Sequence, residues 1–201
     1  VVRVFAMKNA AIAGFAAGIA MAIGGAVGAV STADPRPVID ADAAVMNPMI
    51  DGQAMLPGRQ ILENLAASPL HATFVAQMKA AGIDSALTSG GQFTVFAPTD
   101  AAFAAQGPQP ESTLPRRMSY LVVPGKYDSA TLLRLINEGG GDARLRTVEG
   151  GVLVARMNGP TNIAILDEKG NIANIAIYDV RDRNGIVHVV DRVVEPSGPA
   201  R

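Results

Sequence analysis

Hydrophobic and polar positions divide this chain into a helical first part and a strand-rich second part. Apolar residues recur at helical spacing in three segments, 60–67, 70–81 and 129–137. From residue 144 onward the pattern changes to short apolar runs separated by glycine-containing turns. These runs span residues 144–148, 152–157, 162–166, 172–178 and 186–194. Helices followed by a succession of antiparallel strands predict an α+β domain.

The segment 93–103, FTVFAPTDAAF, predicts a strand that leads directly into a helix. The strand ends at Pro98. Thr99 then offers a side-chain oxygen as a helix N-cap, and Asp100 places its charge near the positive end of the helix dipole. Because capping and the dipole explain both residue types, we expect Thr99 and Asp100 to be structural. Before this segment, residues 87–92 predict a polar turn built on two glycines.

The segment 184–196, NGIVHVVDRVVEP, predicts a turn that feeds a buried strand. Asn184 and Gly185 both tolerate positive φ, which favours the turn. His188 lies between two valines and faces the side of the strand opposite to both. We expect its ring nitrogens to bond backbone or a carboxylate, because buried polar groups are normally satisfied. Asp191 is expected to act as a packing and ion-pair element at the strand end.

These two segments resemble the two signature segments of the fasciclin domain family. The resemblance covers about residues 55–196 and includes the run ILENLAASPLHATFVAQMKAAGI, which is similar to the opening helices of the family. It implies a fasciclin-like fold, an antiparallel or mixed β-wedge or sandwich with several helices packed on one side. It also implies a structural role for His188. In the central segment 119–133, Tyr120 matches the family, but Leu121 stands where a histidine is expected.

The N-terminal pattern predicts an export signal followed by a single domain. Arg3 and Lys8 precede an apolar stretch over residues 10–30, and small residues before Asp34 suit signal cleavage after Ala33. A retained membrane anchor is the competing interpretation, because the stretch is nearly long enough to span a bilayer. Met7 is an alternative start of the chain. We assign residues 1–33 to the signal peptide, 34–58 to a flexible segment, 59–197 to the fasciclin domain and 198–201 to a tail.

Composition excludes several classes of function. The 201 residues include no cysteine, so disulfides, thiolate zinc sites and a catalytic thiol are excluded. The net charge is −1 without a basic run, which argues against a nucleic-acid partner. We find no metal-spaced cluster, no cofactor motif and no nucleophile–base pair for a hydrolase. His71, the second histidine, is expected to cap a helix or to be exposed. The sequence therefore indicates a non-enzymatic protein without metal or cofactor.

Four residues are candidates for binding a partner. In animal fasciclin domains an Asp-Ile pair just before the last signature has been implicated in integrin binding, and Asp179-Val180 stands at this offset with Tyr178 before it. The alternative for Asp179 is an ordinary strand-end residue that accepts backbone hydrogen bonds. Tyr120 belongs to a second adhesion-associated motif, which Leu121 weakens because a Tyr-His pair cannot form.

The resemblance and the export signal together predict a periplasmic or extracellular protein that acts through its surface. We expect cell adhesion or contact with a protein or polysaccharide of a cell surface or matrix, by a monomeric or weakly associating chain. Aromatic and arginine side chains are typical of such contacts, and the additional candidates are Tyr127, Arg181 and Arg183. A carrier of a small apolar ligand, such as a pigment or a lipid-like molecule, is the alternative function.

Overall fold

The computed structural model describes residues 47–198. The predicted signal peptide, the first part of the predicted flexible segment and the end of the tail lie outside these residues. Within the described part, no helix combines the length and the apolar character needed to cross a membrane.

Helices occupy the first two thirds of the described chain. Five of the six α-helices described are α1 (Ile61–Ala67), α2 (Ala72–Ala80), α3 (Ile83–Thr88), α4 (Asp100–Gln106) and α5 (Leu114–Tyr120). A short 3-10 turn, Glu111–Thr113, precedes α5, and α6 covers Ser129–Glu138. The prediction of a turn over residues 87–92 is wrong at its start, because α3 includes Leu87 and Thr88. Gly82 adopts a φ of 69° between α2 and α3, a left-handed conformation that lets the chain begin a new helix immediately.

Seven strands form one mixed sheet in the order β4-β3-β9-β8-β7-β6-β5. They are β3 (Phe93–Pro98), β4 (Val122–Pro124), β5 (Asp142–Arg146), β6 (Val152–Met157), β7 (Ile163–Leu166), β8 (Ile172–Asp182) and β9 (Gly185–Val190). The pair β3–β9 is parallel and the other pairs are antiparallel. A hydrogen bond from Val148 N to Val122 O brings the two outer strands of the sheet close together. The α+β class and the fasciclin-like mixed sheet with packed helices are therefore confirmed.

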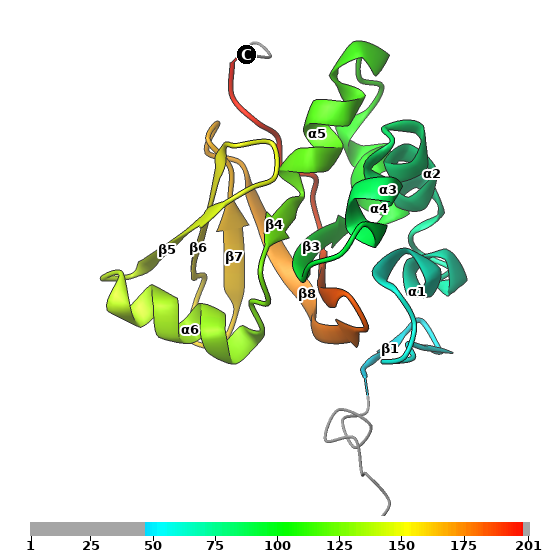
Figure 1. The fold of residues 1–201 in the computed structure, drawn as a ribbon. Coiled ribbons are helices and arrows are strands. Elements are labelled where there is room, and N and C mark those ends of the chain that lie inside the picture. Colours follow the sequence, from blue (N-terminus) through cyan, green and yellow to red (C-terminus); the bar gives the residue numbers. More distant parts are fainter. Residues whose placement is uncertain (1–46, 199–201) are drawn as a thin grey trace, which may run out of the picture. The chain divides into compact units, whose positions relative to one another are not determined.

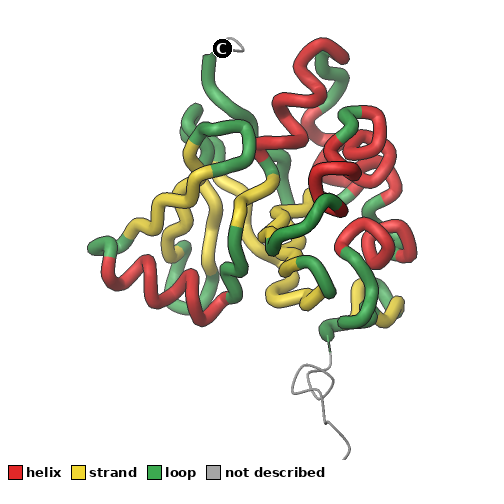
Figure 2. The backbone as a smooth tube through the Cα atoms, in the orientation of Figure 1, coloured by secondary structure: helices red, strands yellow, loops and turns green. Residues whose placement is uncertain are grey.

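The helices form two groups around this sheet (Figure 1, Figure 2). Helices α1 to α5 gather beside β3 and β4, and α6 lies apart from them, packed on β5 and β6. Between the groups, every residue of β9 is buried. Aliphatic side chains dominate this interior, and its largest aromatic members are Tyr120, Phe74 and Phe96. The loop that leads into α6 therefore lies next to the central strands β8 and β9, where the candidate site is formed.

Where the structure describes it, from residue 47 onward, the segment before α1 forms a short hairpin. Strands β1 (Met49–Ile50) and β2 (Gln53–Ala54) form a hairpin. Ile50 is fully buried, so hydrophobic burial holds the hairpin in place. Asn47 fixes its start, because its amide donates to Arg181 O at 2.6 Å and accepts from Arg181 N at 2.8 Å.

Candidate functional site

His188 forms the structural centre of the region that the sequence singled out. It is fully buried in β9, and its ring stacks on Phe96 with the centroids 5.6 Å apart. Nε2 lies 2.8 Å from Tyr127 O, and Nδ1 accepts from Asp179 N at 3.4 Å. Burial lowers the pKa of His188, so the ring is neutral, donates from Nε2 and accepts at Nδ1. Both nitrogens therefore connect β9 to neighbouring segments and neither is free for catalysis.

Asp179 lies inside β8, rather than at its end, and its carboxylate caps α6. A bulge between Ile177 and Val180 displaces it from the regular strand, and its φ of 57° is left-handed. The carboxylate accepts from Ser129 N at 2.7 Å and from Ser129 Oγ at 2.5 Å. Asp128 caps the same helix through Thr131 N at 2.8 Å, and hydrogen bonding from Thr131 lowers the pKa of Asp128.

The other three residues predicted to bind a partner are also engaged inside the fold. Val180 and Tyr120 are fully buried, so neither side chain is presented to a partner in this structure. The Tyr120 hydroxyl donates to Val152 O at 2.8 Å, and burial raises its pKa. Tyr178 is half-buried, and its hydroxyl bonds Asn162 Oδ1 at 2.5 Å and Ile163 N at 2.8 Å. The structure therefore gives Tyr120, Tyr178, Asp179 and Val180 packing and capping contacts in place of a shared binding surface.

Thr99 and Asp100 sit at the junction between β3 and α4. Thr99 Oγ1 accepts from Ala102 N at 3.3 Å, the cap that the sequence predicts for α4. The Asp100 carboxylate points to a different helix, because it accepts from Thr73 N at 2.8 Å and Ala72 N at 3.3 Å. Asp100 therefore caps α2 and joins it to α4.

Asn184 does not adopt positive φ, because among the non-glycine residues of the described chain only Asp51 and Asp179 do. Asn184 instead acts through its side chain. Its Oδ1 accepts from Ile61 N at 2.9 Å, and its Nδ2 donates to Leu87 O at 3.0 Å. The turn predicted at Asn184 and Gly185 is present, although Asn184 itself does not adopt positive φ, and its side chain connects the β8–β9 turn to α1 and α3.

Gly185 begins β9 at a point of close approach. A Cβ atom at this position would lie 1.9 Å from Phe93 O, so only glycine fits beside β3. Asp191, just after β9, is exposed and accepts from Asn174 N at 2.7 Å and Asn174 Nδ2 at 3.0 Å. The ion pair expected for Asp191 is not found within residues 47–198.

His71 is fully buried, so the expectation of an exposed or capping ring is wrong. It occupies the N-cap position of α2, but its side chain makes no cap bond. Its Nδ1 lies 2.8 Å from Ser68 Oγ, and burial lowers the pKa of His71 to about 4. Ser68 is also buried, and neither residue lines the clefts described below. The pair therefore organises the α1–α2 turn.

A cleft of about 620 Å³ opens directly beside the Asp179 bulge. Its lining comes from the segment before α1, the loop into α6 and the β8–β9 turn. Three cationic side chains contribute to it, and these are Lys126, Arg181 and Arg183. Lys126 and Arg183 are exposed, and Arg181 Nη2 lies 3.8 Å from Asp128 Oδ2. We refer to this cavity as the basic cleft.

Asp182 lies in the wall of the basic cleft without adding a full negative charge to it. It is 5% exposed and accepts a hydrogen bond from Asn64 Nδ2, while its Oδ2 has no partner among the described residues. Burial raises the pKa of Asp182 to about 7. Asp128 is then the other acidic side chain in the lining, so cationic groups outnumber anionic ones on a chain of net charge −1.

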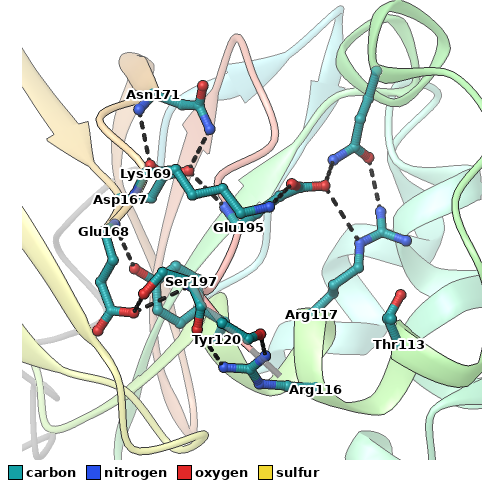
Figure 3. Close-up of polar contacts among 12 residues, drawn as sticks. Thr113, Arg116, Arg117, Tyr120, Asp167, Glu168, Lys169, Asn171, Glu195 and Ser197 are labelled. Carbon is teal, nitrogen blue, oxygen red and sulfur yellow. Dashed lines mark hydrogen bonds and ion pairs between the residues drawn. The ribbon is translucent and has the colours of Figure 1, made fainter. Parts of the chain in front are cut away.

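A network of charged residues on other elements holds the end of the domain (Figure 3). Arg116 of α5 bonds Glu149 Oε1 at 2.6 Å and Ser197 O at 2.9 Å. Asp167, in the β7–β8 turn, accepts from Glu195 N at 2.9 Å. The network fixes the segment after β9 against α5. The described residues contain no group of three or more metal-binding side chains that could hold an ion.

Comparisons with known proteins agree with the fold. The Fasciclin domain model matches residues 69–196. The chain is 35% identical over 144 residues to the uncharacterized protein sll1735 of Synechocystis sp., covering 67% of this chain and 96% of that protein. It is 31% identical over 147 residues to protein sll1483 of the same organism, covering 68% of this chain and 73% of that protein.

A solved structure described as a FAS1 domain pair from the insect cell adhesion molecule Fasciclin I is similar, with a TM-score of 0.56 and 22% identity. The match covers 68% of this chain and 51% of that chain, so the protein spans about half of that domain pair. This likeness concerns the fold. The match to the Fasciclin domain model over residues 69–196 and the identity to the two Synechocystis proteins show that the chain belongs to the fasciclin domain family.

Proposed function

We propose that this protein is an exported, non-enzymatic module that binds an acidic polysaccharide of a cell surface or matrix through the basic cleft. Attachment to such a polymer is the means by which it mediates adhesion or surface contact. The name of the insect relative describes a cell adhesion molecule, which supports this class of function. The apolar stretch over residues 10–30 supports export.

The observation that carries the proposal is the grouping of Lys126, Arg181 and Arg183 in one cleft. Guanidinium groups bind carboxylates through paired hydrogen bonds, and a cleft lined by one sign of charge attracts the opposite sign. The raised pKa of Asp182 supports the same ligand class, because a protonated carboxyl does not repel an anion. An open cleft rimmed by flexible cationic side chains suits repeated acidic units along a polymer.

The binding role falls to the cationic residues of the basic cleft and not to Asp179. The Asp179 carboxylate is occupied by Ser129, whereas Arg183 and Lys126 are exposed. Substituting Asp179 would disturb α6 and thereby the cleft, so a loss of binding in that variant could not identify a direct contact. The arginines are the sharper target for a binding experiment.

The test compares two double variants that remove the same charge. Arg181→Gln with Arg183→Gln empties the cleft of guanidinium groups, and Arg144→Gln with Arg146→Gln removes two exposed arginines of β5 outside it. Binding of alginate is measured by calorimetry, with neutral dextran as the control polymer. We expect the cleft variant to bind alginate at least about tenfold more weakly, since a hydrogen bond to a charged group contributes about 1.5–3 kcal/mol.

The affinity of the β5 variant for alginate should stay within about twofold of that of the wild type. The affinity of the wild type for alginate should fall as the salt concentration rises. Equal losses in both variants would mean that general charge, and not the cleft, attracts the polymer. Equal affinity for dextran and alginate, or no alginate binding by the wild type, would contradict the proposal.

A further inference from the structure

A second cleft, of about 460 Å³, lies among α2, α4, α5 and the loop that joins α4 to α5. Its volume falls in the range of pockets that hold small molecules. Apolar side chains form much of the wall, namely Phe103, Pro108, Pro110 and Leu114. The charged side chains in the lining are Arg117, Glu111, which is exposed, and Asp100, whose carboxylate already accepts from Ala72 N and Thr73 N. We refer to this cavity as the Arg117 cleft.

Arg117 is a buried cation with an incomplete set of partners. It is 6% exposed, and its Nη2 donates to Gln106 Oε1 at 2.7 Å. Gln106 in turn donates to Glu195 Oε1 at 2.5 Å and so stands between the arginine and the nearest carboxylate. Arg117 Nε remains 3.9 Å from Glu195 Oε1 and has no hydrogen-bond partner within residues 47–198. Figure 3 shows Arg117 and Glu195 facing each other across this gap.

Glu195 is also shared with a second cation. Its Oε2 accepts from Lys169 Nζ at 2.6 Å, so one carboxylate serves both Lys169 and Arg117. Buried charges in proteins are normally paired and hydrogen-bonded, because the cost of removing an ion from water is otherwise uncompensated. Burial lowers the pKa of Arg117, which reflects this cost, although a guanidinium stays protonated in proteins. Arg117 therefore has only a distant, shared carboxylate as its charge partner.

A second polar atom in the same cleft also lacks a partner. Gln77 of α2 lines the cleft, and its Oε1 is buried without a hydrogen bond among the described residues. The unpartnered Arg117 Nε–H is a donor beside an apolar wall, which suits a ligand with an anionic head and an apolar body, while Gln77 Oε1 would need a donor such as water.

We propose that the Arg117 cleft binds a small amphipathic carboxylate, with the carboxylate on the Arg117 guanidinium and the apolar body along Phe103 and Leu114. The site is separate from the basic cleft, and the inference does not depend on polysaccharide binding. If the protein is a carrier of a small ligand, the alternative function named above, this site defines that ligand as an acid with a short hydrocarbon chain.

The direct test measures binding of octanoate and of octanol, which share a chain and differ in charge. We expect calorimetry to detect octanoate, with octanol at least about tenfold weaker because it cannot form the charged hydrogen bonds. The Arg117 Nε–H signal in nitrogen-15 NMR should shift during the octanoate titration. Arg117→Gln should weaken octanoate at least about tenfold and leave octanol unchanged.

Two alanines of α4 provide a matched pair that leaves Arg117 and its partners intact. Ala104 lines the cleft and Ala105 does not, although both are exposed. Ala104→Phe should block octanoate, Ala105→Phe should not, and the double variant of Arg181 and Arg183 should bind octanoate like the wild type. Equal binding of octanoate and octanol, no octanoate binding, or equal effects of the two phenylalanine variants would overturn the proposal. The alanine pair decides the question even if Arg117→Gln does not fold.

Discussion

Asp179 of β8 caps helix α6 by accepting hydrogen bonds from both the backbone N and the side-chain Oγ of Ser129. The two residues are 50 positions apart in the chain. The same aspartate has no paired residue in the β8–β9 register, and its backbone adopts a φ of 57° at the bulge. A strained strand position and a helix start are therefore stabilised by one contact.

Asp179→Ala should lower the free energy of unfolding by about 2–4 kcal/mol, combining a lost cap with the strain of a left-handed alanine. Asp179→Asn should cost only about 1 kcal/mol, because asparagine tolerates this φ and retains an acceptor oxygen. Urea unfolding followed by circular dichroism measures both. Asp142→Ala, which removes an exposed ion pair with Arg156, serves as the control and should cost under about 1 kcal/mol. Similar losses for Asp179→Ala and Asp142→Ala would argue against the cap.

Gly185→Ala should lower the free energy of unfolding by at least about 3 kcal/mol, because its Cβ would collide with the backbone oxygen of Phe93. The parallel pairing of β3 with β9 would have to separate to admit it. Gly58→Ala provides the comparison, since no atom lies within 4 Å of a Cβ placed there. That variant should stay within about 0.5 kcal/mol of the wild type. A wild-type midpoint for Gly185→Ala in thermal unfolding would contradict the packing described.

Asp182→Asn should stabilise the protein at neutral and alkaline pH. The folded pKa of about 7 lies above the unfolded value of 3.8, so unfolding releases a proton between these values. The Asp182 carboxyl therefore contributes most to the free energy of unfolding of the wild type below pH 3.8. This contribution falls by up to about 4 kcal/mol as the pH rises to 7 and beyond. Unfolding at pH 4 and pH 8 should show the gain of the variant at pH 8 only. Asp51→Asn, at an exposed position, should show no such gain.

The two histidines should both remain neutral in the folded protein at a pH just below 6.5, where an ordinary histidine is already mostly protonated. Burial lowers the pKa of His71 from 6.5 to about 4 and lowers the pKa of His188 as well. Stability is then full above pH 6.5 and falls as the pH drops toward 4, by up to about 3 kcal/mol from His71. NMR titration of the two imidazole C2 protons resolves each group. A midpoint near 6.5 for either ring would contradict its burial.

The elements of the fold could be predicted from local sequence because their causes are local. Alternation, turn glycines and the Thr99 cap lie within a few residues of what they control. Helix α3 is not among the predicted helices, because a glycine after residue 81 is typical of a helix end, whereas the left-handed φ of Gly82 also allows the next helix to begin. Residues 47–58 show no clear periodicity, and burial of Ile50 and Met55 holds them against the domain.

The contacts that organise the candidate site act over distances that a local pattern does not contain. Asp100 caps a helix 27 positions away, and Asn184 caps one 123 positions away. For the same reason, the sequence could name Arg181 and Arg183 as surface residues but could not bring Lys126 beside them. Arg117 gave no signal at all, because its importance comes from burial and from the position of Gln106.

The placement of β9 between β3 and β8 has a consequence for the order in which the sheet forms during synthesis. The last strand described lies inside the sheet, so β3 and β4 cannot join the other strands until residues 185–190 have emerged from the ribosome. Contacts of such long sequence separation slow folding. Assembly of the sheet therefore waits for its last described strand, even though the strands on both sides of it are made earlier.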